Sequence, residues 1–425
     1  MATETKTGGV DQPRSYSVPM IITLGFLVSM GALHLDPIAS SLPAMATALG
    51  VAKNATVYTV SAFFFGMMIG HIAIGPFSDI FGRKKTILFG LVLLAIGSAS
   101  CAIAPSMQIL LAARALQGLG GAAVMCTGRA VGGDAGKGKA SASMLSYMQV
   151  VSAVTPIIMP LLGQSVSAAF DWRAVFWAMA MMNVALIVAV ALFLKETSST
   201  AGREGAFSSL AKDLKVVFTQ PGFILFAMTF GFGISTFFCY VGASAFVFQN
   251  ELHMDPGTFS VLFSGLAASM VVGGLVSSFF TRRFEPFAFV VTVFILQCID
   301  AATVIYLFKT GQATIPVIAV LFGFIACTTS IVIPVGLSLA LSESGAIKGS
   351  AAAFCGFAQY CFSMIVTSFL GTVKATGSVG QACGVAMVVT TLGAIITAFA
   401  GRAVIRKRDA ALSADTSKLP AQNAH

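Results

Sequence analysis

The hydrophobic residues of the chain gather into about a dozen long apolar runs, and short polar links separate these runs. A helix needs roughly 20 apolar residues to cross about 30 Å of hydrocarbon, so each run is long enough to span a membrane. We therefore predict an all-α membrane protein. The expected spans are residues 17–40, 56–77, 85–104, 107–130, 141–168, 174–195, 221–248, 257–280, 286–308, 313–341, 350–373 and 379–402.

The polar link 196–219 divides the predicted spans into six and six. A weak internal repeat supports this division. Gly274 precedes Arg282 by the same spacing that separates Gly75 from Arg83, and both pairs link the second and third spans of a half. The predicted organisation is a tail 1–16, a six-helix bundle 17–195, a linker 196–219, a six-helix bundle 220–402 and a tail 403–425.

Composition strengthens the membrane assignment. The 425 residues are 57% hydrophobic and 10% charged, with a mean hydropathy of +0.90, which is more apolar surface than a soluble fold could bury. The run that begins at Val18 is too long for a cleaved signal and lacks a small-residue exit, so we expect it to be retained as the first span. The eight cysteines form no C-x-x-C pair and are expected to be packing residues.

The net charge of +9 could indicate either nucleic-acid binding or orientation in a membrane, and the placement of the basic residues distinguishes the two. If the N-terminus is cytoplasmic, 20 of the 25 Lys and Arg fall on cytoplasmic segments and Arg114 lies inside a span. This asymmetry orients the chain with both termini in the cytoplasm and lets its basic residues meet anionic lipid, so nucleic acid is not an expected partner. The four basic residues on the outer side are Lys53, Arg173, Lys309 and Lys374.

The segment between the second and third runs, GPFSDIFGRKK at residues 75–85, is short, charged and bounded by glycines. Gly75 and Gly82 are expected to allow close backbone approach and a tight reversal. Asp79 offers an anion to the positive N-terminal end of a nearby helix, and Arg83 anchors the segment at one membrane face.

This segment resembles the signature loop between helices 2 and 3 of the major facilitator superfamily, roughly G-x-L-[AS]-D-[RK]-x-G-R-[RK]. Phe77 stands where that pattern has Leu, and Ile80 where it has a basic residue. The resemblance implies two six-helix bundles related by a pseudo-two-fold axis along the membrane normal, with a binding site at their interface. The matching residues are Gly75, Ser78, Asp79, Gly82, Arg83 and Lys84.

The resemblance also implies a role for Asp79. In that fold the segment lies against the start of span 11, here near residues 348–350. Asp79 would favour the N-terminus of that helix and hold the two halves closed on the cytoplasmic side, by about 0.3 to 2 kcal/mol. It would act as a conformational latch, together with Gly75, Gly82 and Arg83.

Two ionisable residues inside the spans are the strongest candidates for chemistry. Asp36 lies in HLDPIASSLP of the first span and Arg114 opens RALQGLGGAA of the fourth. Each costs roughly 2.5 to 3.5 kcal/mol at a helix centre, so a functional role is expected. A rise of about 1.5 Å per residue puts their depths within about two turns of each other, a gap that the long Arg side chain could bridge. The alternative is a buried ion pair that only fixes packing.

Further segments extend the resemblance. RALQGLGGAA resembles the span 4 proton-coupling motif RxxQGxGxA, with Gln117 in place. TPIIMPLLG resembles the span 5 antiporter motif, although Thr155 and Gln164 stand where the family has Gly. Asp36 followed by Pro43 is similar to the DxYLPxxP segment of the bicyclomycin and chloramphenicol resistance (Bcr/CflA) branch, without its Tyr-Leu-Pro. The span 5 motif residues are Pro156, Pro160 and Gly163.

The resemblance therefore implies a proton-driven antiporter that exports small, mostly apolar compounds from the cell through the inner membrane, working as a monomer without a cofactor. Asp36 would carry the proton, because a carboxyl group in a poorly hydrated cavity binds a proton more readily than one in water. Arg114 would modulate it. A proton moving down a 100 mV potential supplies about 2.3 kcal/mol, and the sequence has no P-loop for a nucleotide.

The resemblance implies that spans 1, 4, 7 and 10 line the central cavity, with parts of 2, 5, 8 and 11. Aromatic, Met and amide side chains on these spans are candidates for lining it, since such surfaces adapt to varied apolar ligands. Helix packing is the alternative for each. The candidates are Met30, His34, Gln117, Tyr147, Gln149, Phe237, Phe238, Tyr240, Gln359 and Tyr360.

Three other titratable residues stay open. Asp300 in span 9 is either a second proton site or a packing partner, and His34 and His71 either tune the pH response or only pack. A proton-coupled uptake symporter for a small organic acid remains an alternative, although it would need a second deep cation beside Arg114. An intramembrane enzyme lacks H-E-x-x-H or a nucleophile and base grouping, no metal site is expected, and a transporter-like sensor would need an added soluble domain.

Overall fold

The computed structural model describes residues 17–134, 139–197, 212, 215–281, 283–345, 348–373 and 377–416. The described chain is helical throughout, which confirms the predicted all-α class. The helices of its first part are α1 Val18–Val28, α2 Met30–Leu35, the 3₁₀ helix η1 Asp36–Ser41, α3 Leu42–Ala48, the 3₁₀ helix η2 Lys53–Val57, α4 Tyr58–Phe81, α5 Arg83–Ala102, α6 Met107–Gly133, α7 Lys139–Ala169 and α8 Trp172–Phe193. Those of its second part are α10 Pro221–Ala245, the π-helix η3 Phe246–Glu251, α11 Pro256–Phe280, α12 Pro286–Thr310, α13 Ile315–Ser342, α14 Lys348–Gly371 and α15 Val379–Thr416.

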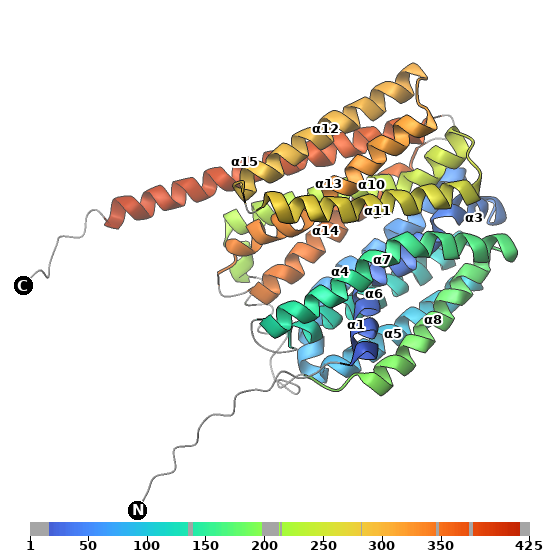
Figure 1. The fold of residues 1–425 in the computed structure, drawn as a ribbon, viewed down its shortest axis with the longest axis horizontal. Coiled ribbons are helices and arrows are strands. Elements are labelled where there is room, and N and C mark those ends of the chain that lie inside the picture. The colour runs from blue at the N-terminus through green and yellow to red at the C-terminus, as the bar shows by residue number, and fades with distance from the viewer. Residues whose placement is uncertain are drawn as a thin grey trace, which may run out of the picture.

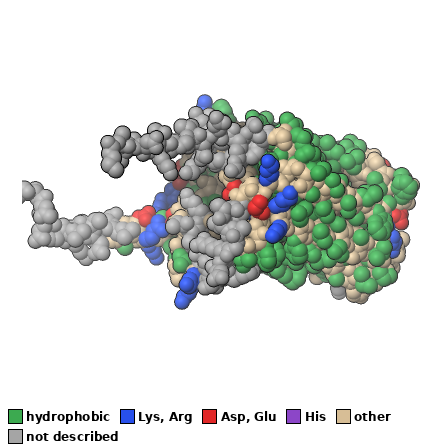
Figure 2. All heavy atoms as spheres, turned by 90° about the horizontal axis from the view of Figure 1, so that it is seen from below, with side chains coloured by type: hydrophobic (Ala, Val, Ile, Leu, Met, Phe, Trp, Pro, Cys, Tyr) green, Lys and Arg blue, Asp and Glu red, His purple; other side chains and the backbone are tan. Residues whose placement is uncertain are grey.

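Eleven of the described helices are long and apolar enough to cross a membrane, and the bent pair formed by Val18–Val28 and Met30–Ala48 would make a twelfth. Hydrophobic side chains cover the middle of the molecule on the face seen in Figure 2, and charged side chains gather toward its two ends. This is the surface of a multi-pass membrane protein, with an apolar belt between two polar ends.

The helices form two groups that lie side by side (Figure 1). We call α1 to α8 the N-terminal half and α10 to α15 the C-terminal half. The chain enters α1 and leaves α15 at the same end of the molecule, which we call the terminal end, and α3 lies at the other, which we call the opposite end. Helix α15 runs past the rest of the bundle at the terminal end, so the predicted tail from residue 403 begins as helix and stays helical to Thr416.

The first span is broken where the sequence predicted one continuous helix. Its two parts meet at Ser29 with a bend of 61°. The Ser29 hydroxyl donates a 2.7 Å hydrogen bond to the Gly25 carbonyl, a contact that often bends helices. Farther along, Pro37 has no amide hydrogen, and the chain tightens into the 3₁₀ segment η1 at Asp36. The break therefore sets the direction in which Asp36 leaves the helix.

The predicted glycine-bounded link at 75–85 is mostly helix. Helix α4 runs to Phe81, α5 starts at Arg83, and the reversal takes place at Gly82 alone, with φ of +91°. This left-handed backbone favours glycine, and a Cβ at Gly82 would lie 2.6 Å from Oε2 of Glu196. The expected close approach at Gly75 is wrong for this conformation, because a Cβ there would meet nothing within 4 Å.

The two halves are joined by side-chain hydrogen bonds at the opposite end. The hydroxyls of Ser61 and Thr367 lie 2.8 Å apart, between α4 and α14. Asn54 donates to the carbonyl of Val373 at 3.2 Å. A further bond, from Gln249 to the Ser40 carbonyl at 3.0 Å, joins η3 to η1. The interface is therefore closed at this end.

Close packing continues along α4 and α14 as far as His71. A Cβ at Gly371 would lie 2.8 Å from the ring of Tyr58, and one at Gly356 would lie 2.1 Å from Cδ2 of His71. Both glycines are thus required for the two helices to approach each other. Beyond His71 the helices separate, since Ile74 and the residues after it line a cavity.

Candidate functional site

Two cavities lie between the halves. The first, of about 330 Å³, lies toward the terminal end between α4 and α6 on one side and α10, α13 and α14 on the other; we call it the outer cavity. The second, of about 200 Å³, lies deeper between α2, η1 and α7 on one side and α10, α11, α13 and α14 on the other; we call it the deep cavity. Gln359 and Tyr360 line both, so they form the boundary between them.

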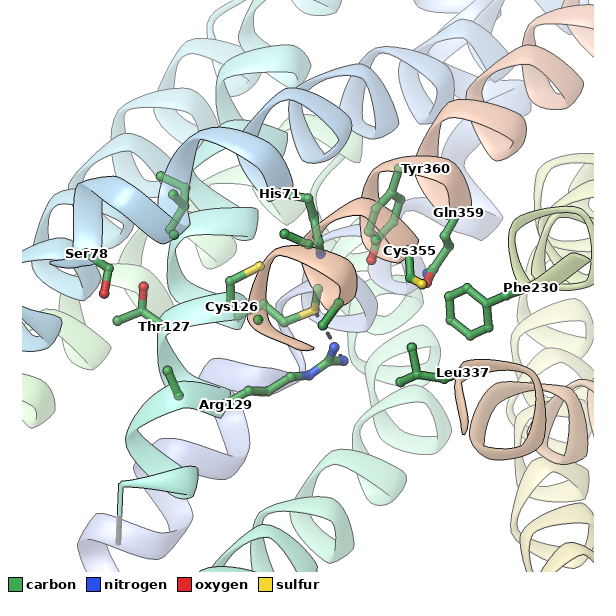
Figure 3. Close-up of a pocket in the computed structure, with 18 of the residues that line it drawn as sticks. His71, Ser78, Cys126, Thr127, Arg129, Phe230, Leu337, Cys355, Gln359 and Tyr360 are labelled. Atoms are coloured by element: carbon green, nitrogen blue, oxygen red, sulfur yellow. Dashed lines mark hydrogen bonds between the residues drawn. The ribbon is translucent and has the colours of Figure 1, made fainter. Parts of the chain in front are cut away.

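The outer cavity combines aromatic walls with a guanidinium group (Figure 3). His71 and Tyr360, one from each half, lie with their rings 4.9 Å apart, and Phe230 and Leu337 form the wall beside them. The exposed side chain of Arg129 reaches from α6 into the space between these groups.

The charged residues that line the outer cavity are basic. Arg83 and Arg129 are among its lining residues, and no Asp or Glu of the described chain is. Arg83 pairs with Asp79 and Asp134, each at 3.4 Å. Arg129 donates to the sulfur of Met125 at 3.8 Å and forms no ion pair with a described residue.

Sequence reasoning missed Arg129. Counting basic residues by membrane side groups Arg129 with the cytoplasmic residues, because it lies near the predicted end of span 4. Its position relative to Arg114, 15 residues earlier on the same helix, gives no signal either, because Arg114 is buried inside the N-terminal half whereas Arg129 is exposed on the outer cavity.

The deep cavity contains Asp36. Its side chain is 8% exposed and lies across from Tyr240, Phe237 and Phe238 of α10. No hydrogen bond or ion pair connects the Asp36 carboxyl group to another described residue, although it lies in apolar surroundings. An acid in such surroundings gains stability by binding a proton or a partner of opposite charge.

Arg114 does not line either cavity and does not pair with Asp36. It is fully buried inside the N-terminal half, where it donates to the carbonyls of His34 at 2.9 Å and Thr59 at 3.2 Å and to Gln117 Oε1 at 2.8 Å. The Phe63 ring lies 4.8 Å from its guanidinium carbon. The expected bridge is wrong because counting residues gives depth, whereas the break in the first span decides which way Asp36 faces.

The connection between the two residues is made through the backbone. Arg114 holds the carbonyl of His34, two residues before Asp36. That carbonyl is available because Pro37, which would face it in a three-residue turn, has no amide hydrogen. Arg114 therefore fixes the segment from which the Asp36 side chain extends, and it does so as a cation held by carbonyl and amide oxygens and by an aromatic face.

His34 belongs to the same buried network. Its Nδ1 lies 3.1 Å from the Met30 carbonyl, which can only accept, so Nδ1 carries the hydrogen. Its Nε2 lies 3.1 Å from the Asn183 amide and accepts from it. Both nitrogens are thus satisfied in the neutral ring. The prediction that Met30, His34 and Gln117 line the cavity is wrong for this conformation, because all three are fully buried within the N-terminal half.

Five of the other predicted lining residues do line a cavity: Phe237, Phe238 and Tyr240 the deep one, and Gln359 and Tyr360 both. Tyr147 and Gln149 line neither. Pro156 of the same helix lines the deep cavity, and Tyr147 lies nine residues away, about two and a half turns, on the other side of the helix. Gln149 is exposed about two turns nearer the terminal end.

The span 5 motif residues press α7 against the segment that carries Asp36. A Cβ at Gly163 would lie 2.1 Å from the Pro37 carbonyl oxygen, so only glycine permits this approach. Pro160 is buried, and Pro156 faces the deep cavity. Together with Arg114, which holds the His34 carbonyl, Gly163 fixes the position of η1 from a second side.

The charges of the 75–85 segment are satisfied within the N-terminal half. Arg83 donates to Ser78 at 2.6 Å as well as contacting Asp79. Glu196, which sequence reasoning did not single out, accepts from the backbone amides of Arg83 at 2.9 Å and Lys84 at 3.1 Å and so caps α5.

The predicted partner of Asp79 was the start of α14. The side chain of Lys348 lies outside the described residues, and Gly349 lines the outer cavity on the wall that faces Gly75. Asp79 thus pairs with Arg83 in its own half while a cavity separates the two walls.

Asp300 lies within the C-terminal half, away from both cavities. Its side chain is 6% exposed, and its Oδ2 has no described hydrogen-bond partner. Gln297, one turn earlier, also has an unpaired Oε1. Among the described residues no cluster of three or more His, Cys, Asp and Glu side chains could hold a metal ion.

The sequence pattern that describes the Major Facilitator Superfamily matches residues 20–398. The chain belongs to this superfamily. Its fold agrees: a D-xylose-proton symporter of known structure superposes with a TM-score of 0.70 at 16% identity, covering 89% of this chain and 97% of the symporter. A bacterial homologue of the human lysosomal transporter Spinster gives a TM-score of 0.67 at 13% identity, covering 91% and 96%. The predicted major facilitator fold is thereby confirmed.

Sequence relatives within the superfamily cover most of the chain. An uncharacterized MFS-type transporter of Bacillus subtilis, YdgK, is 29% identical over 83% of this chain and 88% of its own length. The multidrug resistance protein MdtL of Shewanella oneidensis is 26% identical, over 87% and 92%. MdtL of Escherichia coli is 25% identical, over 88% and 93%. This chain is therefore a membrane transporter of small molecules by family.

Proposed function

We propose that this protein is a proton-coupled exporter of small, mostly apolar compounds, of the Bcr/CflA type, that works by alternating access in an inner membrane. The observation that carries the proposal is the Asp36 carboxyl group, which lies without a described partner on the wall of the deep cavity between the halves. Relatives named multidrug resistance protein support the direction of transport.

The chemistry follows from the surroundings of Asp36. When Asp36 is protonated it is neutral and compatible with Phe237, Phe238 and Tyr240; when it is ionised it is an unpaired charge beside apolar surface. A substrate that occupies the cavity changes the hydration of the carboxyl group and thereby the proton affinity. Proton and substrate would then exchange, and Arg114 would hold the segment in place throughout.

The orientation proposed places the terminal end in the cytoplasm. Lys84, Lys85 and the basic residues of α15 lie at this end, as the positive-inside rule requires. The outer cavity would then open toward the cytoplasm, from which a compound to be exported enters.

Asp36→Asn tests the proposal. We expect it to abolish proton-coupled transport, because Asn cannot release a proton, while the protein stays folded in the membrane. Inside-out vesicles with an imposed pH gradient, read by quenching of a pH-sensitive dye during a substrate screen, give the measurement. Asp171→Asn is the matched control, since Asn also caps the helix that Asp171 caps. Unchanged gradient-driven transport in the Asp36 variant would remove this carboxyl group from the mechanism.

A second candidate function is proton-coupled uptake of a small organic acid. The specific observation in its favour is Arg129, a cation that lines the outer cavity, whereas Arg114 lines neither cavity. The same vesicles separate the two functions: an exporter moves substrate and proton in opposite directions, whereas a symporter moves both in one direction.

A further inference from the structure

The outer cavity is positively charged although most of its wall is apolar. Its described lining contains the guanidinium groups of Arg83 and Arg129, the imidazole of His71, and no carboxylate. Nδ1 of His71 donates to the Met67 carbonyl at 2.8 Å and therefore carries the hydrogen of the neutral ring. In that form His71 adds no charge to the cavity. The sign of the cavity is therefore set by the two arginines.

The two arginines are not equivalent. Arg83 is held by Asp79, Asp134 and Ser78, so its charge is largely compensated within the N-terminal half. Arg129 has only the weak Met125 sulfur as a described hydrogen-bond partner and extends into the cavity. An arginine in contact with bulk water needs no partner, but one on the wall between the two halves would lose its water if the proposed alternating access closed the cavity around it.

This loss of water would favour a ligand that can pair with the Arg129 guanidinium group. Closing the outer cavity around an unpaired guanidinium would be costly, because a buried charge without a partner is strongly destabilising. A ligand that carries a carboxylate or sulfonate would satisfy Arg129 by charge-assisted hydrogen bonds, and its apolar body would pack on Phe230, Leu337 and Tyr360.

We propose that the outer cavity selects amphipathic organic anions, and that Arg129 binds their acidic group. This inference rests on the proposed transport function, and it names the substrate class. The volume of about 330 Å³ suits a body of one or two aromatic rings. Tyr360 and Gln359 separate the anion from Asp36 in the deep cavity, so the two sites of opposite sign do not neutralise each other.

The test is a binding measurement that needs no gradient. Naphthoate, naphthamide and naphthylmethylammonium share one aromatic body and differ in charge. Equilibrium dialysis against the full-length protein in phosphatidylcholine nanodiscs, with empty nanodiscs subtracted, gives their affinities. We expect naphthoate to bind about tenfold or more tightly than naphthamide, as a charge-assisted hydrogen bond provides. The ammonium compound should bind weakest.

Variants assign the preference to one residue. Arg129→Gln should bring naphthoate and naphthamide to similar affinity, while Arg129→Lys should retain part of the preference. Arg283→Gln is the matched control, since Arg283 lies on the ring of Phe279 outside both cavities. Unchanged naphthamide binding in Arg129→Gln shows that the cavity is intact.

Three results would overturn the inference: equal affinities for naphthoate and naphthamide in the wild type, tightest binding of the ammonium compound, or a preference that survives in Arg129→Gln. The proposed function fails on a different result, the absence of gradient-driven transport in vesicles. Each can therefore fail without the other.

Discussion

The two ends of the interface between the halves differ in almost every respect. At the opposite end, Ser61 meets Thr367, and Asn54 and Gln249 donate across the gap. At the terminal end, the same two helices, α4 and α14, form facing walls of a cavity, and the charges of the 75–85 segment pair inside one half.

This difference identifies the conformation. The described side-chain bonds that cross the interface are neutral and lie at one end, while at the other end Arg83 pairs with Asp79 and Asp134 inside its own half and no described ion pair crosses the cavity. Neutral hydrogen bonds contribute about 0.5 to 1.5 kcal/mol each, so the closed end is held by a sum of modest terms that a bound ligand could outweigh. The structure is therefore one conformation, bonded across the interface at the opposite end and hollow at the terminal end; the proposed alternating access requires the opposite end to open in another.

The largest effect is expected from locking the closed end of the interface. In Ser61→Cys with Thr367→Cys, the two sulfurs would replace hydroxyls that are 2.8 Å apart, close enough for a disulfide. We expect oxidation to abolish transport and reduction to restore it. A protease site placed in the 198–211 link detects the disulfide on a non-reducing gel. After cleavage the two halves run as one band if the disulfide has formed and as two bands if it has not.

Two controls accompany this experiment. Each single cysteine variant should transport normally under oxidation, since none of the eight native cysteines forms a disulfide in the described structure. Gly75→Cys with Gly349→Cys lies on facing walls of the outer cavity and should not cross-link while the terminal end is open. Full transport by the oxidised Ser61 and Thr367 double variant would contradict alternating access.

A smaller effect is expected from the charged end. Asp79→Asn removes a partner of Arg83 in an exposed ion pair, an interaction of about 0.2 to 1 kcal/mol. Because the latch role concerns closure and not substrate contact, turnover should fall about twofold to fivefold with the same order of preference among substrates. Initial rates in vesicles for several substrates give the measurement, and an altered order of preference would argue against the latch.

The smallest effect is expected from a single neutral bond at the closed end. Gln249→Ala removes the bond to the Ser40 carbonyl, worth about 0.5 to 1.5 kcal/mol, and should raise the alkylation rate of a Ser61→Cys thiol about twofold to tenfold. Gln312→Ala, exposed after α12, is the control. An unchanged alkylation rate in the Gln249 variant would show that this bond does not hold the end closed.

The sequence predicted most of the helices because long apolar runs have few alternatives to spanning a membrane. It also predicted Asp36 as a residue of the central cavity, but only together with the family resemblance, because Asp300 is likewise an acid in an apolar run and lies away from both cavities. It could not predict the bend at Ser29, because the sequence does not show that the Ser29 hydroxyl donates to the Gly25 carbonyl. The predicted contact between Asp36 and Arg114 was therefore wrong: Arg114 binds the His34 carbonyl instead.

The residues missed were those whose role depends on distant parts of the chain. Glu196 caps α5 from 113 positions away, a contact that no local pattern encodes. Arg129 was assigned by its membrane side, which ignores the helical face. Tyr147 was assigned to the cavity by its span, although it lies on the side of α7 turned away from Pro156.

The fit of His71 over Gly356 has a consequence for how the molecule would move. It is the last tight contact before α4 and α14 separate, so it lies where a pivot would lie between the closed opposite end and the open terminal end. Points near a pivot travel little while distant points travel far. Tyr360 and the deep cavity would thus keep nearly the same shape while one end of the interface closes and the other opens. A bound substrate could then keep its contacts throughout the change.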